Sequence, residues 1–559
     1  MRRSRKSSLM PTTGTTRWDR ETFFVLQLAA CISFLSFLYY LRQGDVLLYG
    51  DAVAHINIAR RVFDSRTPGL LQLGTVWLPL PHLLMIPFLL IHSMWQTGIG
   101  GSIPSMIAYI FGAVGIFRLV RCGLSFHSQP DSAANGAAWI AAGIYAANPN
   151  LVYLQSTAMT EPLYLALFIW TMVHFSEFVQ AGTLADERTQ LAASSSLVKC
   201  GACLAAACLT RYDGWFLTAA ICVAAVPIIV KSRRNSAMLL PGFKTFIVLA
   251  VLAPALWIAY NAAVYRNPVE FANGPYSAKA IEQKNPTGTT YPGSHNLPVA
   301  FSFFFKSAEL NVAEGVWQKF WVALLIAGVA LAVIFDRRRW PFLLLLTPVP
   351  FYMLSIAYSG VPIYVPSWWP FSYYNVRYGI ELLPAFSVFV SLTIYFLLGF
   401  ARNRASKAAV VFGTLIFVAG SYVAVWRAKP ASYQEALMNS RTRIALETEL
   451  ASTFKKLPSN STLLMYLGNH VGALQQAGIP LRQVINEGNH RPWEKPADPQ
   501  GLWERALSNP RQYADYVVAA EGDPVATGVR KDELTPMVII NVSGQPPVTI
   551  SWTHRQSAQ

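Results

Sequence analysis

The sequence predicts a mainly α-helical protein that crosses a membrane many times and ends in a small soluble α/β domain. Of its 559 residues, 53% are hydrophobic and only 13% are charged, which is unusual for a soluble chain. Apolar runs of roughly 18 to 24 residues recur from Phe23 to Trp426, and each is long enough to cross a bilayer as a helix. From Lys429 onward the composition is that of an ordinary soluble domain.

The apolar runs predict about eleven spanning helices. Their approximate bounds are 23–41, 103–121, 134–153, 162–180, 196–210, 213–230, 243–265, 318–335, 340–358, 377–400 and 406–426. A shorter apolar segment, Pro79 to Ile91, contains three prolines and is too short to cross. We therefore expect it to form an interfacial or re-entrant helix on the outer face.

The net charge of +16 is explained by topology and predicts no nucleic-acid partner, because the basic residues lie in short clusters between apolar runs. With residues 1–22 in the cytoplasm, most basic clusters fall in inside connections. These clusters contain Arg118, Arg121, Arg188, Lys231, Arg233, Arg234, Arg337 to Arg339, Arg402, Arg404 and Lys407. The sequence thus predicts a membrane domain over 23–428, with extracytoplasmic loops at 42–102, 266–317 and 359–376, and an extracytoplasmic α/β domain over 429–559.

The tail alternates strand-like and helix-like segments. Residues 461–480 are typical of a strand, a glycine-containing turn and a helix, and residues 513–525 of a buried strand that ends in a turn. A short helix is expected between them, at 501–510. The tail contains no glycine-rich nucleotide-binding pattern.

The first outer loop carries polar residues directly after the first apolar run. Asp51 opens a predicted surface helix that ends near Gly69, and His55 lies one turn later on the same side. Asp51 either caps this helix or faces a pocket together with His55. Arg60 and Arg61 bind either anionic headgroups in general or one specific phosphate.

Two further outer-face positions combine acids with an arginine. Glu161 opens an apolar span, where a carboxylate is costly unless it is paired or solvated, so it is a functional candidate or a helix N-terminal acid. Arg211 and Asp213 share a tight connection between two spans. They form either an internal salt bridge or part of a binding site.

The late segment Arg377 to Pro384 adds a second arginine at the start of a span. Arg377 either clamps a phosphate or pairs with Glu381 at i, i+4 spacing, and Tyr378 lies beside it. The loop around Lys279 is rich in turn residues. It is either a lid over an outer-face site or a loop without a special role.

This layout resembles the GT-C type glycosyltransferases, closest to glycosyltransferase family 39, the protein O-mannosyltransferases and the aminoarabinose transferases. The resemblance rests on the acidic first loop, the acid that heads the fourth span, the Arg-Tyr-Asp-Gly turn, the Arg377-Tyr378 segment and the soluble tail. It implies sugar transfer from a polyprenyl-phosphate donor to a protein, lipid or glycan acceptor. We expect the protein to lie in a bacterial inner membrane.

The resemblance also implies roles for individual residues. Asp51 matches the first-loop acid and would be the general base, and Glu161 matches the second acid in placement. Family 39 members carry an Asp-Glu pair in the first loop, whereas Ala52 follows Asp51 here. We therefore expect a metal-independent mechanism that requires no cofactor. For the leaving phosphate, Arg377 ranks before Arg211 and Lys279, because negative charge develops there.

Two other classes of protein remain open. A transporter also has many spans and membrane-embedded charges, although this chain shows no evident internal repeat and its polar candidates gather at one face. A non-catalytic glycan- or lipid-binding subunit would keep the architecture without the chemistry.

Overall fold

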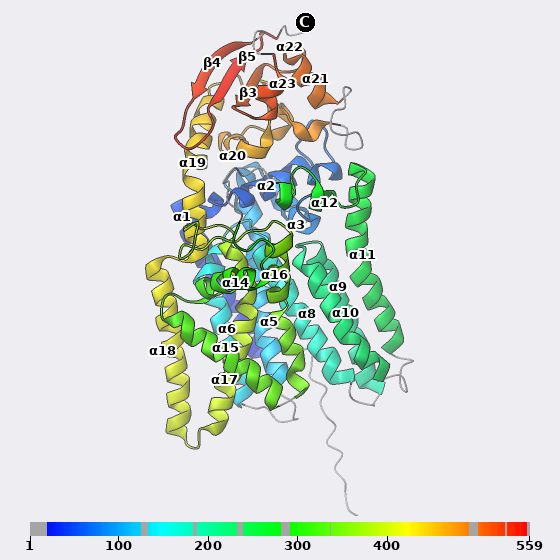
Figure 1. The fold of residues 1–559 in the computed structure, drawn as a ribbon, viewed down its shortest axis with the longest axis vertical. Coiled ribbons are helices and arrows are strands. Elements are labelled where there is room, and N and C mark those ends of the chain that lie inside the picture. Colours follow the sequence, from blue (N-terminus) through cyan, green and yellow to red (C-terminus); the bar gives the residue numbers. More distant parts are fainter. Residues whose placement is uncertain are drawn as a thin grey trace, which may run out of the picture.

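The computed structural model describes residues 19–124, 132–182, 187–231, 239–280, 291–335, 337–490, 501–530 and 534–555. The described chain forms a long helical bundle with a small α/β domain at one end (Figure 1). This arrangement confirms the predicted fold class, a polytopic membrane domain followed by a soluble α/β domain.

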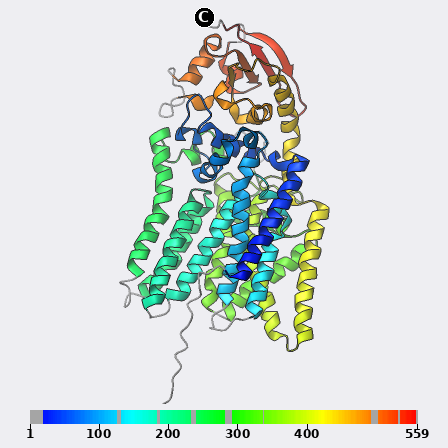
Figure 2. The same ribbon diagram turned by 180° about the vertical axis from the view of Figure 1, so that it is seen from behind.

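Ten helical segments within the described ranges are long and apolar enough to span a membrane. They are α1 (Arg20–Gln43), α5 (Ile99–Leu124), α8 (Glu161–Gly182), α9 (Glu187–Cys208), α10 (Asp213–Lys231), α11 (Leu239–Tyr265), α15 (Trp317–Ile334), η4 (Arg337–Leu346) with α16 (Pro348–Tyr358), η5 (Val376–Leu382) with α17 (Leu383–Phe400), and α18 (Arg404–Ala428). Seen from behind, α1 lies beside α5 in the bundle (Figure 2).

The predicted span over 134–153 differs in detail, because it is broken into α6 (Ser132–Ala146) and α7 (Pro149–Leu154). The Asn148 side chain accepts a hydrogen bond from the backbone N–H of Leu151, so a new helix starts there with Pro149 in its first turn. α6 packs against α5 and α17 inside the bundle. α5 finishes at one end of the bundle and α8 starts at the other end. α6 and α7 together therefore cross the bundle once.

Short helices occupy the junction between the bundle and the α/β domain (Figure 1). They are η1 (Asp45–Leu47), α2 (Gly50–Arg61), η2 (Leu70–Leu73), α3 (Pro79–Leu89), α4 (His92–Gln96) and α12 (Glu270–Asn273). α14 (Leu297–Val312) lies lower, within the bundle, where it packs against α16 and η5 (Figure 1). α3 has only 11 residues, as expected for a helix that does not cross. The helix predicted around Asp51 is α2.

The α/β domain is built on a five-stranded sheet with the order β2-β1-β3-β5-β4. β1 (Leu463–Met465) runs parallel to β2 (Val484–Ile485) and β3 (Tyr516–Ala520), whereas β5 (Val548–Trp552) runs antiparallel to β3 and to β4 (Thr535–Ile540). The other elements are α20 (Leu467–Ala477), η6 (Leu481–Gln483), η7 (Glu487–Asn489), α21 (Leu502–Ser508), α22 (Pro510–Tyr513) and α23 (Pro524–Gly528). β1, α20, α21 and β3 confirm the elements predicted in the tail.

A single long helix, α19 (Ala431–Phe454), joins the bundle to this domain. It begins after Lys429, whose positive φ of 67° breaks the chain direction between α18 and α19. α19 then rises from the bundle to the sheet, where it packs against α20 (Figure 1).

Candidate functional site

Several of the charged residues singled out in the sequence meet where the bundle joins the α/β domain. Two arginines, Arg211 and Arg377, are surrounded there by five acids from α2, α8, α10, η5 and α19. The acids are Asp51, Glu161, Asp213, Glu381 and Glu435. We call these seven residues the two-arginine cluster.

Arg377 contacts a different acid with each of its three guanidinium nitrogens. Nε lies 3.1 Å from Glu161 Oε1, Nη1 lies 2.7 Å from Glu435 Oε1, and Nη2 lies 2.5 Å from Asp51 Oδ2. The guanidinium carbon also lies 4.9 Å from the centre of the Tyr378 ring. The alternative pairing of Arg377 with Glu381 is wrong: η5 is a 3₁₀-helix, in which residues i and i+4 do not share a face.

Glu435 was not anticipated from the sequence. Its carboxylate accepts hydrogen bonds from the backbone N–H groups of Asn375 and Arg377, both at 3.1 Å, as well as from the Arg377 side chain. Glu435 therefore fixes both the backbone and the guanidinium of Arg377. It lies in a largely polar stretch of the tail, where an acid would ordinarily be solvated, and no local pattern distinguishes it.

Arg211 forms the second half of the cluster. Nε lies 3.2 Å from Asp213 Oδ2, which confirms the internal salt bridge, and Nη2 lies 3.2 Å from Glu381 Oε1. The Tyr352 hydroxyl lies within hydrogen-bonding distance of both acids, at 3.0 Å and 2.7 Å. Tyr378 lies beneath this arginine too, with 5.0 Å from the guanidinium carbon to its ring centre.

Glu161 connects the two halves. Its Oε1 atom accepts from Arg211 Nη1 at 3.3 Å and from Arg377 Nε at 3.1 Å. Its Oε2 atom is buried and has no hydrogen-bond partner among the described residues. Glu161 is also the first residue of α8, where the helix dipole stabilises a carboxylate. Glu161 is therefore both the first residue of α8 and a member of the cluster, so the two interpretations of this acid are compatible.

Asp51 is the accessible acid of the cluster. Its side chain is 39% exposed, whereas the other four acid side chains are between 0% and 6% exposed. The N-cap of α2 is Tyr49, so the interpretation of Asp51 as the N-cap is wrong, and its carboxylate pairs with Arg377 instead. Of the five acids, Asp51 is the one that a substrate reaches most easily.

His55 does not pair with Asp51, contrary to one of the two alternatives. It is buried, and its Nδ1 lies 2.9 Å from His82 Nε2 of α3, with Trp77 beside the ring. Burial, together with the positive charges of Arg377 and Arg211, lowers the pKa of His55 to about 3. The imidazole is therefore neutral and packs α2 onto α3.

Arg60 is also turned inward. Its Nε lies 2.8 Å from Asp64 Oδ2, its Nη1 donates to the Leu89 carbonyl, and its guanidinium carbon lies 4.9 Å from the centres of the Phe63 and Trp95 rings. At 5% exposure this side chain does not reach headgroups or a substrate phosphate, so that interpretation is wrong.

Lys279 makes none of the contacts of the cluster; it is an exposed residue in the helical segment that begins at Ala278, after α12. The middle of the proposed lid, residues 281–290, lies outside the described residues. Among the residues that are described, no group of three or more histidines, cysteines or acids is arranged to hold a metal ion.

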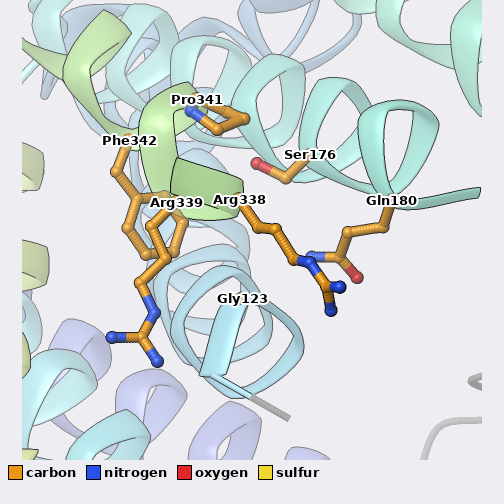
Figure 3. Close-up of a pocket in the computed structure, with 7 residues that line it drawn as sticks. All are labelled: Gly123, Ser176, Gln180, Arg338, Arg339, Pro341 and Phe342. Carbon is orange, nitrogen blue, oxygen red and sulfur yellow. The ribbon is translucent and has the colours of Figure 1, made fainter. Parts of the chain in front are cut away.

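A small pocket lies at the other end of the bundle. It is lined by Gly123, Ser176, Gln180, Arg338, Arg339, Pro341 and Phe342 (Figure 3). Gln180 follows Glu161 by 19 residues along α8, which is roughly 28 Å at 1.5 Å per residue. This pocket is therefore separate from the two-arginine cluster.

Comparison with known proteins establishes the fold. No family model matches the sequence, and no curated protein matches it. The chain shares its fold with solved structures of ArnT. It is similar to crystal structures of ArnT from Cupriavidus metallidurans, one bound to undecaprenyl phosphate (TM-score 0.59) and one in the apo state (TM-score 0.58). Each match covers 96% of this chain and 99% of that chain, at 12% sequence identity.

Proposed function

We propose that the protein transfers a sugar from a polyprenyl-phosphate donor to an acceptor on the outer face of the membrane, with Asp51 as the general base. The observation that carries this proposal is the placement of one accessible carboxylate against an arginine, at the junction of a GT-C fold. The similar ArnT structure was crystallised with undecaprenyl phosphate, the class of lipid that such a donor releases.

The proposed chemistry is an inverting displacement. The acceptor hydroxyl oxygen attacks the anomeric carbon, the bond from that carbon to the phosphate oxygen breaks, and Asp51 takes the hydroxyl proton. The departing polyprenyl phosphate gains negative charge, which Arg377 Nη2 stabilises. We propose that no step requires a metal ion or another cofactor.

Entry of the donor exchanges one contact of the cluster. Arg377 already contacts three acids, and Asp51 is the most exposed of them, so its contact is the easiest to replace. A donor phosphate that takes this place at Nη2 frees the Asp51 carboxylate to accept a hydrogen bond from the acceptor hydroxyl. Glu161, Asp213 and Arg211 do not touch the substrate in this scheme; they position Arg377 and Tyr378.

We place the polyprenyl chain in a groove that runs along α14 and has a volume of about 410 Å³. Its lining combines three aromatic residues with four polar ones: Phe301, Phe305, Trp368, Ser302, Lys306, Glu309 and Ser367. The opposite side of α14 packs against η5, the element that carries Arg377. A lipid in this groove would therefore lie behind the helix that supports the phosphate-binding arginine.

The test uses purified protein with short-chain polyprenyl phosphates that carry a hexose or a pentose, and measures release of the polyprenyl phosphate with a membrane extract as acceptor. Asp51→Asn should lower turnover by about 10²–10⁴-fold, the usual contribution of a general base. Glu449→Gln, an exposed acid on α19, is the matched control and should leave turnover unchanged. Full turnover by Asp51→Asn would overturn the assignment of the base. Solute flux in vesicles, without donor consumption by the wild type, would favour a transporter.

A further inference from the structure

The helix α19 holds both sides of the Asp51–Arg377 contact. Near its start, Glu435 binds the backbone and the guanidinium of Arg377. About two turns later, Arg443 reaches the segment that precedes Asp51. One helix, α19, thus sets the relative position of Asp51, which lies in α2, and Arg377, which lies in η5.

Arg443 binds the end of η1. Its Nη2 atom donates to the carbonyl oxygens of Leu47 at 3.0 Å and Leu48 at 2.9 Å. Carbonyls at the end of a short helix have no partner within the helix, and a cationic side chain can satisfy them by donating hydrogen bonds. A Cβ atom on Gly50, the first residue of α2, would lie 3.8 Å from Arg443 Nε. Asp51 is the next residue, so the guanidinium supports the backbone that aims its carboxylate.

Two tyrosines tie the same segment to α19. The Tyr433 hydroxyl donates to Asp45 Oδ2 at 2.7 Å, and the Tyr49 hydroxyl donates to the Ser432 carbonyl at 2.7 Å. These contacts locate the start of η1 and the N-cap of α2, but neither reaches the carbonyls between them. That part of the backbone is held by Arg443.

The orientation of Arg443 is set in turn from the α/β domain. Its Nη1 atom lies 2.5 Å from Glu447 Oε2, one helical turn further along α19, and the two side chains are only 15% and 7% exposed. The Glu447 carboxylate fills the space beside Gly472 of α20, where a Cβ atom would overlap it. α20 follows β1 directly, so the sheet, Glu447, Arg443 and the Asp51 segment form one continuous series of contacts.

We propose that Arg443 is a positioning residue for sugar transfer, which couples the α/β domain to the general base. This inference rests on the proposed function, in which Asp51 accepts the proton. Loss of Arg443 leaves the Leu47 and Leu48 carbonyls without their partner and lets the first turn of α2 shift. A shift of about 1 Å at a catalytic group is enough to lower a rate by up to roughly 10²-fold.

The experiment is a double-mutant cycle on turnover. Arg443→Ala should lower kcat by about 10- to 100-fold with little change in KM for the donor. In an Asp51→Asn background, Arg443→Ala should lower kcat no further, because the carboxylate that Arg443 positions has been removed. Arg441→Ala, an exposed arginine on the same helix, is the control and should match the wild type. An Arg443→Ala effect that persists in full without the Asp51 carboxylate would overturn the proposal, since it would show a general structural role.

A second measurement separates this inference from the proposed function. Hydrogen–deuterium exchange at the amide of Val53, which donates to the Tyr49 carbonyl, should speed up in Arg443→Ala and in Gly472→Ala but not in Arg441→Ala. Unchanged exchange in both variants would overturn the positioning role even if the enzyme were active. If Asp51→Asn kept full turnover while this exchange changed as expected, the base assignment would fail and the coupling between the domains would stand.

Discussion

Replacing Arg377 by lysine tests whether the guanidinium holds the cluster together. Arginine presents three nitrogens to three acids, at 3.1 Å, 2.7 Å and 2.5 Å. A lysine ammonium keeps the charge but is a single point, and it cannot reach Glu161, Glu435 and Asp51 from one position. The substitution therefore removes about two charge-assisted hydrogen bonds while it leaves the formal charge unchanged.

The expected cost follows from burial. Glu161 and Glu435 have side chains that are each only 1% exposed, so water does not replace a lost contact there. Hydrogen bonds to charged groups contribute about 1.5–3 kcal/mol each, which gives about 3–6 kcal/mol for two. For a chain of this length the unfolding midpoint should fall by roughly 3–5 °C.

The assay is the temperature at which half of the detergent-solubilised protein remains monodisperse, followed by size-exclusion chromatography. Arg441→Lys, on the exposed side of α19, is the matched control and should leave this temperature unchanged. If Arg377→Lys lost transfer activity but kept the thermal stability of the control, Arg377 would act on the donor alone. That result would refute the argument that its contacts to the acids hold the cluster.

Three further substitutions probe the same region. Glu435→Gln should destabilise the protein by about 1–3 kcal/mol in thermal unfolding, because an amide at this position leaves at least one of the N–H donors around it without an acceptor. Gly379→Ala should lower both stability and turnover, since a Cβ atom there would overlap the backbone of α14, whereas Gly143→Ala on α6 meets no atom within 4 Å and should be neutral. Below pH 6.5 the unfolded chain takes up a proton at His55, whose pKa in the folded protein is about 3. His55 alone should therefore contribute a fall in stability whose slope approaches about 1.4 kcal/mol per pH unit as the pH drops from 6.5 to 5, and melting curves of His55→Gln should show a shallower fall.

The fold could be predicted because its signals are local. Each spanning helix is a run of apolar residues, and the strands and helices of the tail have their own short patterns. The span over 134–153 shows where this reasoning ends. Its average composition is apolar, but Asn148 and Pro149 restart the helix inside it, and average hydropathy does not register a cap.

It was easier to predict which residues belong to the site than to predict which of them form ion pairs with one another. Asp51, Glu161, Arg211 and Arg377 stood out as charges beside apolar runs, and the structure brings all four together. The partner of Arg377 was assigned by helical spacing, which fails because η5 is not an α-helix. Glu435 is 58 residues away from Arg377 in sequence, so only the path of α19 brings the two together.

The charge balance of the cluster makes its two halves depend on each other. Five acids meet only two guanidinium groups, and four of the five acids are at most 6% exposed. Buried carboxylates are costly without a cationic partner, so each arginine has to serve several acids at once. Glu161 accepts from both arginines through a single oxygen atom. A ligand that draws Arg377 toward itself therefore withdraws a contact from Glu161, and Arg211 is the neighbouring cation that is already placed to compensate.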